Sequence, residues 1–179
     1  MKKTNLKKLN IGCGFDIKEG YVNLDSVKLK GVDIVHDLDS FPYPFKDDTF
    51  EDILCSHVLE HVSDITKVME EIYRISKDKA KVKIMVPYFA SPNAWRDPTH
   101  KRLFNYDTFS YFSESCYYND VKMDVVKKRL IFLSSKGRFM MSSCDIVNKV
   151  INLFPVIYQR FFCYYLPFSE VHFLLEVKK

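Results

Sequence analysis

The sequence predicts an open α/β sheet, and two observations carry that prediction. Five short apolar runs come first, with one amphipathic helix between the fourth and the fifth, and two further runs close the 179-residue chain. Four of the early runs end directly at a residue suited to binding, namely Gly12, Asp25, Asp37 and His57. Because ligands bind outside the carboxyl ends of the strands in such sheets, this edge is the predicted binding site.

The first two strands, residues 7–11 and 21–25, frame a glycine turn. Residues 15–20 are too few for a full crossover helix, so we expect a turn between the strands. Glycines there allow the backbone to approach a ligand closely, and the carboxylate of Asp25 can accept hydrogen bonds from two ribose hydroxyls. Residues 33–36 predict a third strand, followed by a loop rich in proline, acids and aromatics.

Residues 50–56 predict a fourth strand, with the continuous apolar character that is typical of a strand buried on both faces. Asp64 is expected to cap a helix that reaches about residue 77, because the apolar positions that follow recur at helical spacing. Residues 81–86 alternate between polar and apolar side chains and predict the fifth strand.

The second half of the chain is less regular. The polar, proline-punctuated residues 91–102 predict a loop, and residues 105–112 a short helix. Residues 124–133 and 171–177 predict the last two strands, which we expect to pair with each other. Residues 134–170 do not fit this plan and indicate an insertion or lid that contains an aromatic helix.

Composition limits the classes of protein. Hydrophobic residues are 47% of the chain, which is enough for a core, and we expect a single domain over residues 1–179. The five cysteines form no C-x-x-C pair, so neither a disulfide framework nor a zinc knuckle is indicated. No apolar run is long enough to span a bilayer, and we therefore expect a cytoplasmic location.

Four stretches of residues 7–89 carry a family resemblance: LNIGCG, YVNLD, HDLDSFPYPFKDDTFEDILCSHVLEHV and IMVPYF. They resemble the class I S-adenosylmethionine-dependent methyltransferases, in the small prokaryotic, methyltransferase-11-like group with a shortened first crossover. The resemblance implies a Rossmann-like, seven-stranded sheet, mostly parallel with an antiparallel last strand and a reduced first crossover helix. It also implies S-adenosyl-L-methionine as the cofactor.

The resemblance also implies a cofactor site, carried over position by position. The glycine loop would pass under the methionine portion, Asp25 would hold the ribose, and Asp37 would lie beside the adenine. Asn10 stands where the family has an acid, and the family's third loop glycine is missing. The predicted cofactor residues are Asn10, Gly12, Cys13, Gly14, Asp25, Ser26, Asp37, Leu38, Ser56 and His57.

Methyl transfer from a sulfonium needs a general base only if the acceptor must lose a proton. We predict His57, Asp97 and His100 as catalytic residues, with His61 as a further candidate base. Read alone, residues 57–61 (HVLEH) match an inverted zinc-protease motif. A helix that starts after the strand end at His57 begins too late to align both histidines, so we assign no metal ligand.

The acceptor is left open by the sequence. We expect a small molecule or a sugar or lipid precursor. Two alternatives stay open: a catalytically silent binding module, and an RNA or protein methyltransferase. The net charge of +4 is too mild to favour nucleic acid. The apolar residues 150–168 could form a lid, a dimer face or a peripheral membrane contact, and the oligomeric state is open.

Overall fold

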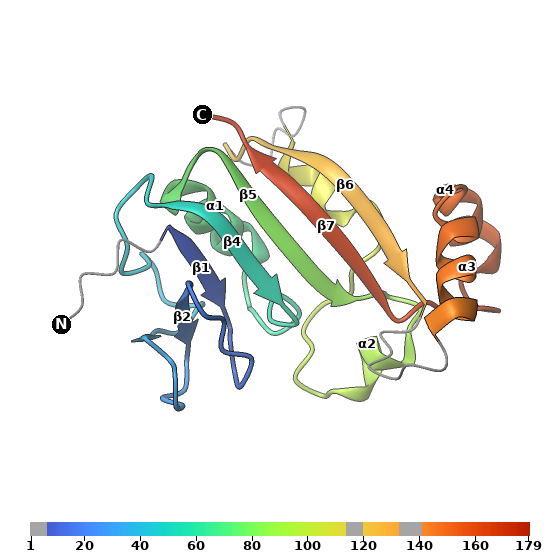
Figure 1. The fold of residues 1–179 in the computed structure, drawn as a ribbon, viewed down its shortest axis with the longest axis horizontal. Helices are drawn as coiled ribbons and strands as arrows, with labels where there is room; N and C mark the ends of the chain where they lie inside the picture. The colour runs from blue at the N-terminus through green and yellow to red at the C-terminus, as the bar shows by residue number, and fades with distance from the viewer. Residues whose placement is uncertain (1–6, 114–119, 133–140) are drawn as a thin grey trace.

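A computed structural model describes residues 7–113, 120–132 and 141–179. They form one seven-stranded sheet with strand order β3-β2-β1-β4-β5-β7-β6 (Figure 1). The last strand lies between β5 and β6 and is antiparallel to both, as the arrowheads in Figure 1 show, which confirms the predicted architecture. The strands are β1 (Lys8–Ile11), β2 (Val22–Asp25), β3 (Ile34–Val35), β4 (Phe50–Ser56), β5 (Ser76–Pro87), β6 (Met123–Ile131) and β7 (Glu170–Val177).

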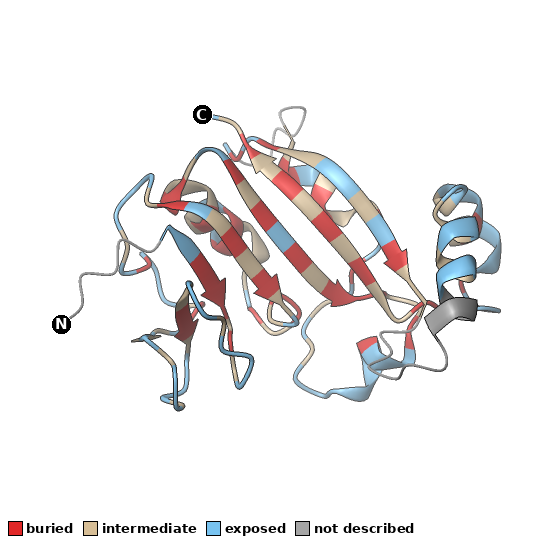
Figure 2. Cartoon of the chain, in the orientation of Figure 1, coloured by how far each residue is buried: buried red, intermediate tan, exposed pale blue. Residues whose placement is uncertain are grey.

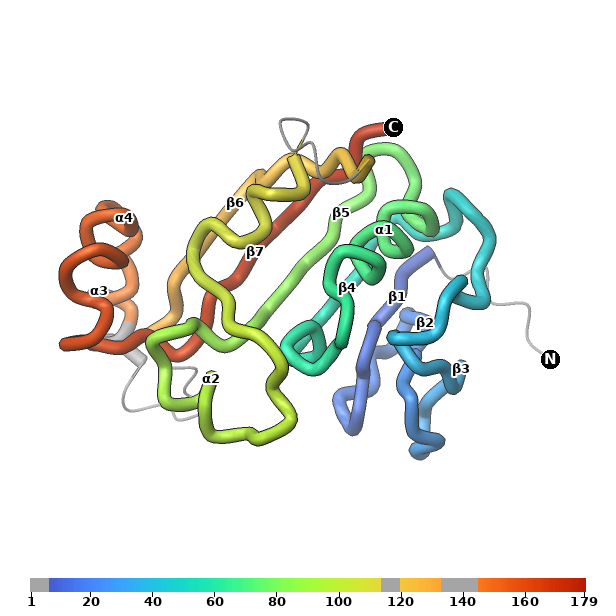
Figure 3. Tube along the Cα trace, turned by 180° about the vertical axis from the view of Figure 1, so that it is seen from behind, coloured from blue at the N-terminus to red at the C-terminus, as the bar shows by residue number. Residues whose placement is uncertain are grey.

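One face of the sheet holds the core. The helix α1 (Ile65–Ile75) and the 3₁₀ helix η1 (Thr108–Phe112) lie on this face, behind the sheet in Figure 1 and in front of it in Figure 3. Buried and more exposed residues alternate along the strands (Figure 2). Such alternation is typical of a sheet with one solvated face. The apolar side chains of the covered face form one continuous cluster.

The other face of the sheet is polar, and none of the described helices crosses it in Figure 1. Lys83 forms an ion pair with Asp52 at 3.0 Å, and Lys81 pairs with Glu176 across β5 and β7. Leu54 on β4 is only half-buried. The expectation that β4 is buried on both faces is therefore wrong, because the crossovers that would cover the second face are short.

Asp64 caps α1 as predicted, since its side chain accepts hydrogen bonds from the backbone amides of Thr66 and Lys67, each at 3.1 Å. The helix ends two residues before the predicted limit. Ser76 already pairs with Phe50 of β4, so β5 begins five residues earlier than the alternation predicted. The charged residues 77–79 interrupt the apolar alternation before the regular pairing with β4 begins at Lys81, so the pattern did not predict a strand there.

Part of the predicted loop 91–102 is helical. Ser91 accepts a hydrogen bond from the amide of Asn93, and Pro92 occupies the first turn of the short helix α2 (Pro92–Arg96). Proline is well suited to a first helical turn, because its missing N–H needs no partner there. The loop prediction was wrong for these residues, since proline was taken only as a helix breaker.

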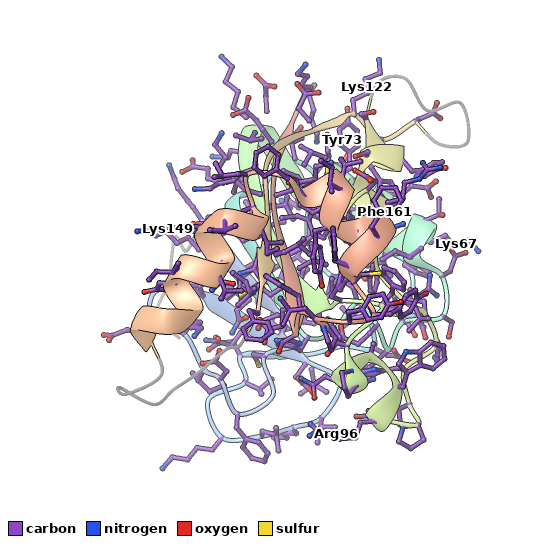
Figure 4. All side chains as sticks on the ribbon, turned by 90° about the vertical axis from the view of Figure 1, so that its right-hand side faces the viewer. Lys67, Tyr73, Arg96, Lys122, Lys149 and Phe161 are labelled. Carbon is purple, nitrogen blue, oxygen red and sulfur yellow. The ribbon has the colours of Figure 1, made fainter. Side chains whose placement is uncertain are left out.

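Residues 134–170 were expected to contain an aromatic helix, and residues 134–140 of this stretch lie outside the described residues. The described part is a helical segment rich in aromatic residues, which packs at the β6 end of the sheet. It contains α3 (Met141–Ile151), α4 (Pro155–Ile157) and a π-helix, η2 (Tyr158–Phe162). Asn152 bonds both the N–H and the C=O of Leu130, which covers part of the free edge of β6. Figure 4 views this end, with Lys149 and Phe161 on the two sides of the segment. Over the described part of the chain, no helix has both the length and the apolar character needed to cross a membrane.

Candidate functional site

A cavity of about 540 Å³ opens at the carboxyl ends of β1, β2 and β4. Seven of the ten predicted cofactor residues line it, and they lie at or just after the ends of four strands, β1 to β4. The lining residues are Gly12, Gly14, Asp25, Ser26, Asp37, Leu38, Asp39, His57, Val58, His61, Val62 and Lys101. We call this space the donor cavity.

The glycine loop and Asp25 are joined directly. Gly12 and Gly14 have left-handed φ angles of 63° and 48°, which glycine adopts without steric cost. The N–H of Gly14 donates to Oδ2 of Asp25 at 2.7 Å, and the N–H of Val27 donates to Oδ1 at 3.0 Å. Each carboxylate oxygen accepts one such bond and keeps a lone pair, so the group is fixed in place and can still accept from a diol.

Three predicted cofactor residues do not line the donor cavity. Asn10 is buried and donates to the backbone oxygen of Asp16 at 2.9 Å, so it holds the loop from beneath. Cys13 is also buried, and this burial, with the charge of Asp25, raises the pKa of its thiol. Ser56 is half-buried at the end of β4, where it pairs with Met85.

On the far side of the donor cavity, Asp37 is exposed and Leu38 is 7% exposed, giving a carboxylate beside an apolar wall. Asp39, two residues further on, also lines the donor cavity and was not predicted. Burial would raise the pKa of its carboxyl, but hydrogen bonds from the N–H and hydroxyl of Ser63, with the charge of Lys101, outweigh it and lower the pKa. Asp39 is the second acidic residue of residues 36–39 (HDLD), and its place beside Asp37 could have predicted it as a site residue.

A second cavity, of about 560 Å³, adjoins the first. His57 and His61 line both cavities, and they therefore form a shared wall. The predicted catalytic residues Asp97 and His100 belong to this second cavity, which we call the acceptor cavity. Its lining residues are His57, Glu60, His61, Pro87, Asn93, Arg96, Asp97, Pro98, His100, Ser169 and Glu170.

His57 occupies the end of β4 with a left-handed φ of 52°, which is uncommon outside glycine. Its Nε2 lies 3.5 Å from Oε1 of Glu170, and its Nδ1 lies 3.5 Å from Oε1 of Glu60. The carboxylate of Glu170, aided by Glu60 and opposed by burial, raises the pKa of His57 to about 10. A protonated imidazole has no free lone pair, so this state disfavours the base role predicted for His57 and favours positioning and charge.

Glu60 and Glu170 were missed as site residues. Burial would raise the pKa of Glu170, but hydrogen bonds from His172 and His57 outweigh it and lower the pKa to about 2. Glu170 comes from β7, whose antiparallel register sets it opposite Pro87 at the end of β5. Glu60 lies inside the HVLEH motif, whereas the place of Glu170 in the site depends on a strand pairing that is distant in the sequence.

The rings of His61 and His100 meet edge to face, with centroids 4.8 Å apart. Nδ1 of His61 lies 2.9 Å from the hydroxyl oxygen of Thr99, and Nδ1 of His100 lies 2.9 Å from the carbonyl oxygen of Ala94. Together with Glu60, the two histidines offer three potential metal ligands within 4.8 Å of one another.

Comparisons with known proteins agree with this geometry. Residues 5–84 match the methyltransferase domain family. A curated relative, the uncharacterized protein MJ0638 of Methanocaldococcus jannaschii, is 37% identical over 103 residues. That match covers 48% of this chain and 44% of the relative, so the chain spans less than half the length of that protein.

Two solved structures share the fold. A SAM-dependent methyltransferase from Archaeoglobus fulgidus superposes with a TM-score of 0.57 at 18% identity, over 96% of this chain and 88% of that one. Phosphoethanolamine N-methyltransferase 2 of Haemonchus contortus, in complex with S-adenosyl-L-methionine, superposes with a TM-score of 0.53 at 15% identity, over 96% and 48% of the two chains. With its sheet order and these matches, the chain has the fold of the S-adenosylmethionine-dependent methyltransferases, and its residues 5–84 match the methyltransferase domain family.

Proposed function

We propose that this protein transfers a methyl group from S-adenosylmethionine, held in the donor cavity, to a small acceptor held in the acceptor cavity. The observation that carries the proposal is the shared wall of His57 and His61 between two cavities of similar size. Bound there, the cofactor would supply a methyl group already activated on a positively charged sulfur. Since the leaving group needs no further activation, holding the two reactants in line supplies much of the rate.

The residues of the donor cavity suit each part of that cofactor. The anchored carboxylate of Asp25 is suited to a ribose diol, and Asp37 with Leu38 is suited to an amine-bearing base. Among the described residues, nothing lies within 4 Å of the place where a side chain of Gly14 would begin, which leaves space for the amino-acid portion, whereas the space beside Gly12 is filled by Val58. The carboxylates of Glu60 and Glu170 beside His57 offset its positive charge, which would otherwise repel a sulfonium.

The lining of the acceptor cavity supports a polar acceptor, since Asn93 and Arg96 face it from α2. The neighbouring aromatic segment supports an apolar portion on that acceptor, as in a sugar or lipid precursor. The ring of Tyr164 lies 5.9 Å from that of Phe89, whose carbonyl oxygen accepts a hydrogen bond from Trp95 at 3.0 Å. The lid role of residues 134–170, the single-domain organisation, the membrane contact and the cytoplasmic location stay predictions.

Calorimetry with S-adenosylmethionine and S-adenosylhomocysteine tests the donor assignment. Asp25→Ala should weaken binding at least tenfold, because the variant loses a charged acceptor worth about 1.5–3 kcal/mol per hydrogen bond. Asp16→Ala is the matched control, since this nearby side chain is exposed and bonds Lys18 outside the cavity. Equal affinity in both variants would refute the ribose assignment.

Turnover is tested separately, with labelled cofactor and cell extracts fractionated into small molecules, lipids, RNA and protein. Label in the small-molecule or lipid fraction supports the proposal. Label in RNA or protein would replace its acceptor class, and tight cofactor binding without transfer to any fraction would favour the catalytically silent module.

A further inference from the structure

Glu60, His61 and His100 lie where the two cavities meet, and their potential ligand atoms are within 4.8 Å of one another. Glu60 and His61 leave the end of β4 together, while His100 comes from the loop after α2. We propose that these three side chains bind one divalent transition-metal ion, of the zinc type, which holds an oxygen atom of the acceptor. The acceptor role rests on the proposed function, whereas the binding of the ion does not.

The hydrogen bonds of the two imidazoles fix the tautomer that a metal requires. A carbonyl oxygen only accepts, so Nδ1 of His100 must carry the proton that it donates to Ala94 at 2.9 Å. Nε2 of His100 is then left with its lone pair. Metal-binding histidines are commonly oriented in this way, with the second nitrogen donating to a carbonyl or a carboxylate.

The same result holds for His61 through one intermediate. The hydroxyl of Thr99 donates to Oδ1 of Asp97 at 2.7 Å, and its oxygen is thereby free to accept from Nδ1 of His61 at 2.9 Å. Nε2 of His61 therefore also carries a lone pair. Asp97, which the sequence suggested as a catalytic residue, acts in this arrangement as a positioning residue behind the histidine.

Glu60 supplies an independent observation. The residue is 1% exposed, and its buried Oε2 has no hydrogen-bond partner among the residues that the structure describes. Leaving a buried carboxylate oxygen without a partner costs free energy, which a bound cation would recover. Oε1 of the same carboxylate faces His57 at 3.5 Å, so Oε2 is the atom available to an ion.

Two imidazole nitrogens and one carboxylate oxygen form a donor set suited to zinc and to neighbouring transition metals rather than to magnesium or calcium. Ligands about 2.1 Å from one ion lie at most about 4.2 Å apart, so the three groups need only a small side-chain adjustment to close on it. Three protein ligands leave a fourth position open, which is the arrangement of catalytic rather than structural zinc sites.

The open position determines the class of acceptor that we infer. All three ligands line the acceptor cavity and His61 also lines the donor cavity, so an oxygen bound to the ion lies beside the incoming methyl group. A metal ion lowers the pKa of a bound hydroxyl, whose proton leaves to solvent. The oxygen lone pair then forms the new C–O bond, and the electrons of the breaking C–S bond neutralise the sulfonium. We therefore infer methylation of a hydroxyl oxygen.

Metal binding is measured first, on the full chain stripped with a chelator and titrated with Zn²⁺ and then Co²⁺. We expect one ion per chain with a dissociation constant in the micromolar range or below, and a cobalt absorption spectrum without a thiolate charge-transfer band. The absence of this band would show that none of the five cysteines of the chain binds the ion. A thiolate spectrum, or no saturable binding at one equivalent, would overturn the proposal.

The variants His61→Ala, His100→Ala and Glu60→Gln should each weaken binding at least tenfold. His36→Ala is the matched control, because this histidine bonds Ser40 near β3 and lines neither cavity. His100 is only half-buried, so its variant is expected to fold even if the change at the buried Glu60 does not. Unchanged affinity in His100→Ala, with a native melting temperature, would refute the site.

The failures of the two proposals can be distinguished. Affinity for S-adenosylhomocysteine is measured on the same stripped and zinc-loaded samples. Donor binding without ion binding would refute only the metal site, and ion binding without donor binding would refute only the methyltransferase function. If both the ion and S-adenosylhomocysteine bind, removing the ion with a chelator should lower turnover at least tenfold. The affinity for S-adenosylhomocysteine should change no more than twofold.

Discussion

Replacing Gly12 with alanine tests the donor loop most directly. With φ at 63°, any residue other than glycine costs about 1–2 kcal/mol at this position. An added Cβ would also lie 2.2 Å from Cγ2 and 2.6 Å from Cβ of Val58, well inside contact distance. Overpacking of this kind costs about 1–3 kcal/mol. We therefore expect Gly12→Ala to lose about 2–5 kcal/mol of unfolding free energy.

Gly20→Ala separates the two causes of that loss. Gly20 also has a left-handed φ, of 79°, but no atom of the described part of the chain lies within 4 Å of its added Cβ. Only the backbone cost of about 1–2 kcal/mol should remain. Each kcal/mol shifts the melting temperature of a chain of this size by about 2–4 °C, so an extra cost of about 2 kcal/mol places the Gly12 variant about 4–8 °C lower.

Urea and thermal unfolding measure this difference, and a double-mutant cycle identifies its cause. Val58→Ala removes the nearest of the two clashing atoms, so it should recover at least about 1 kcal/mol in the Gly12→Ala background. Val58 also lines the donor cavity, and its displacement should weaken binding of S-adenosylhomocysteine. Equal melting temperatures for the two glycine variants, or no coupling to Val58, would refute the reasoning.

Three further predictions concern stability. Hydrogen bonds from Arg74 and from the Tyr43 amide outweigh burial and lower the pKa of the Glu71 carboxyl. The stability that this carboxylate contributes is therefore fully present above about pH 4.3 and is lost as the pH falls below it. Glu71→Gln should lose about 1–3 kcal/mol of unfolding free energy at neutral pH, and its unfolding free energy should fall less steeply with acidification. Phe109→Ala should cost about 3–5 kcal/mol because the ring is fully buried, whereas Phe15→Ala, 91% exposed, should stay within about 0.5 kcal/mol in the same urea titration. Asn10→Asp should cost about 1–3 kcal/mol by thermal unfolding, and a stability equal to that of the natural chain would contradict its assigned role.

Features set by neighbouring residues were predictable from the sequence. The cap at Asp64, the glycine turn at Gly12 and the carboxylate at Asp25 depend on a few adjacent positions, and each lies where the pattern indicated. A mostly parallel sheet with an antiparallel last strand was also predicted, from the family resemblance, and the structure has it. The start of β5 was not predicted, because it is set by the pairing of Ser76 with Phe50 of β4 and not by the charged residues that follow Ser76.

Features set by distant pairing could not be predicted. Glu170 reaches His57 only because β7 lies between β5 and β6 in the sheet. The residues around position 170 do not predict this place for the strand. The acceptor cavity depends in the same way on distant residues, since the loop after α2 returns to the end of β4 to complete its lining. Lys101 shows that return, since its backbone N–H donates to the carbonyl oxygen of Glu60 at 2.8 Å.

The shortened first crossover explains why Asn10 is an amide where the family has an acid. The N–H of Lys18 donates to Oδ1 of Asn23 at 2.9 Å, so that oxygen faces inward, and Asn10 donates to the same oxygen at 3.0 Å and to the backbone oxygen of Asp16 at 2.9 Å. Both partners are acceptors, so a carboxylate at position 10 would meet them without a proton to share. The buried side-chain amides of Asn10 and Asn23 therefore hold, in place of a crossover helix, the loop in which Gly14 donates to Asp25. A short loop of this kind requires a hydrogen-bond donor at position 10, which an amide supplies and a carboxylate does not.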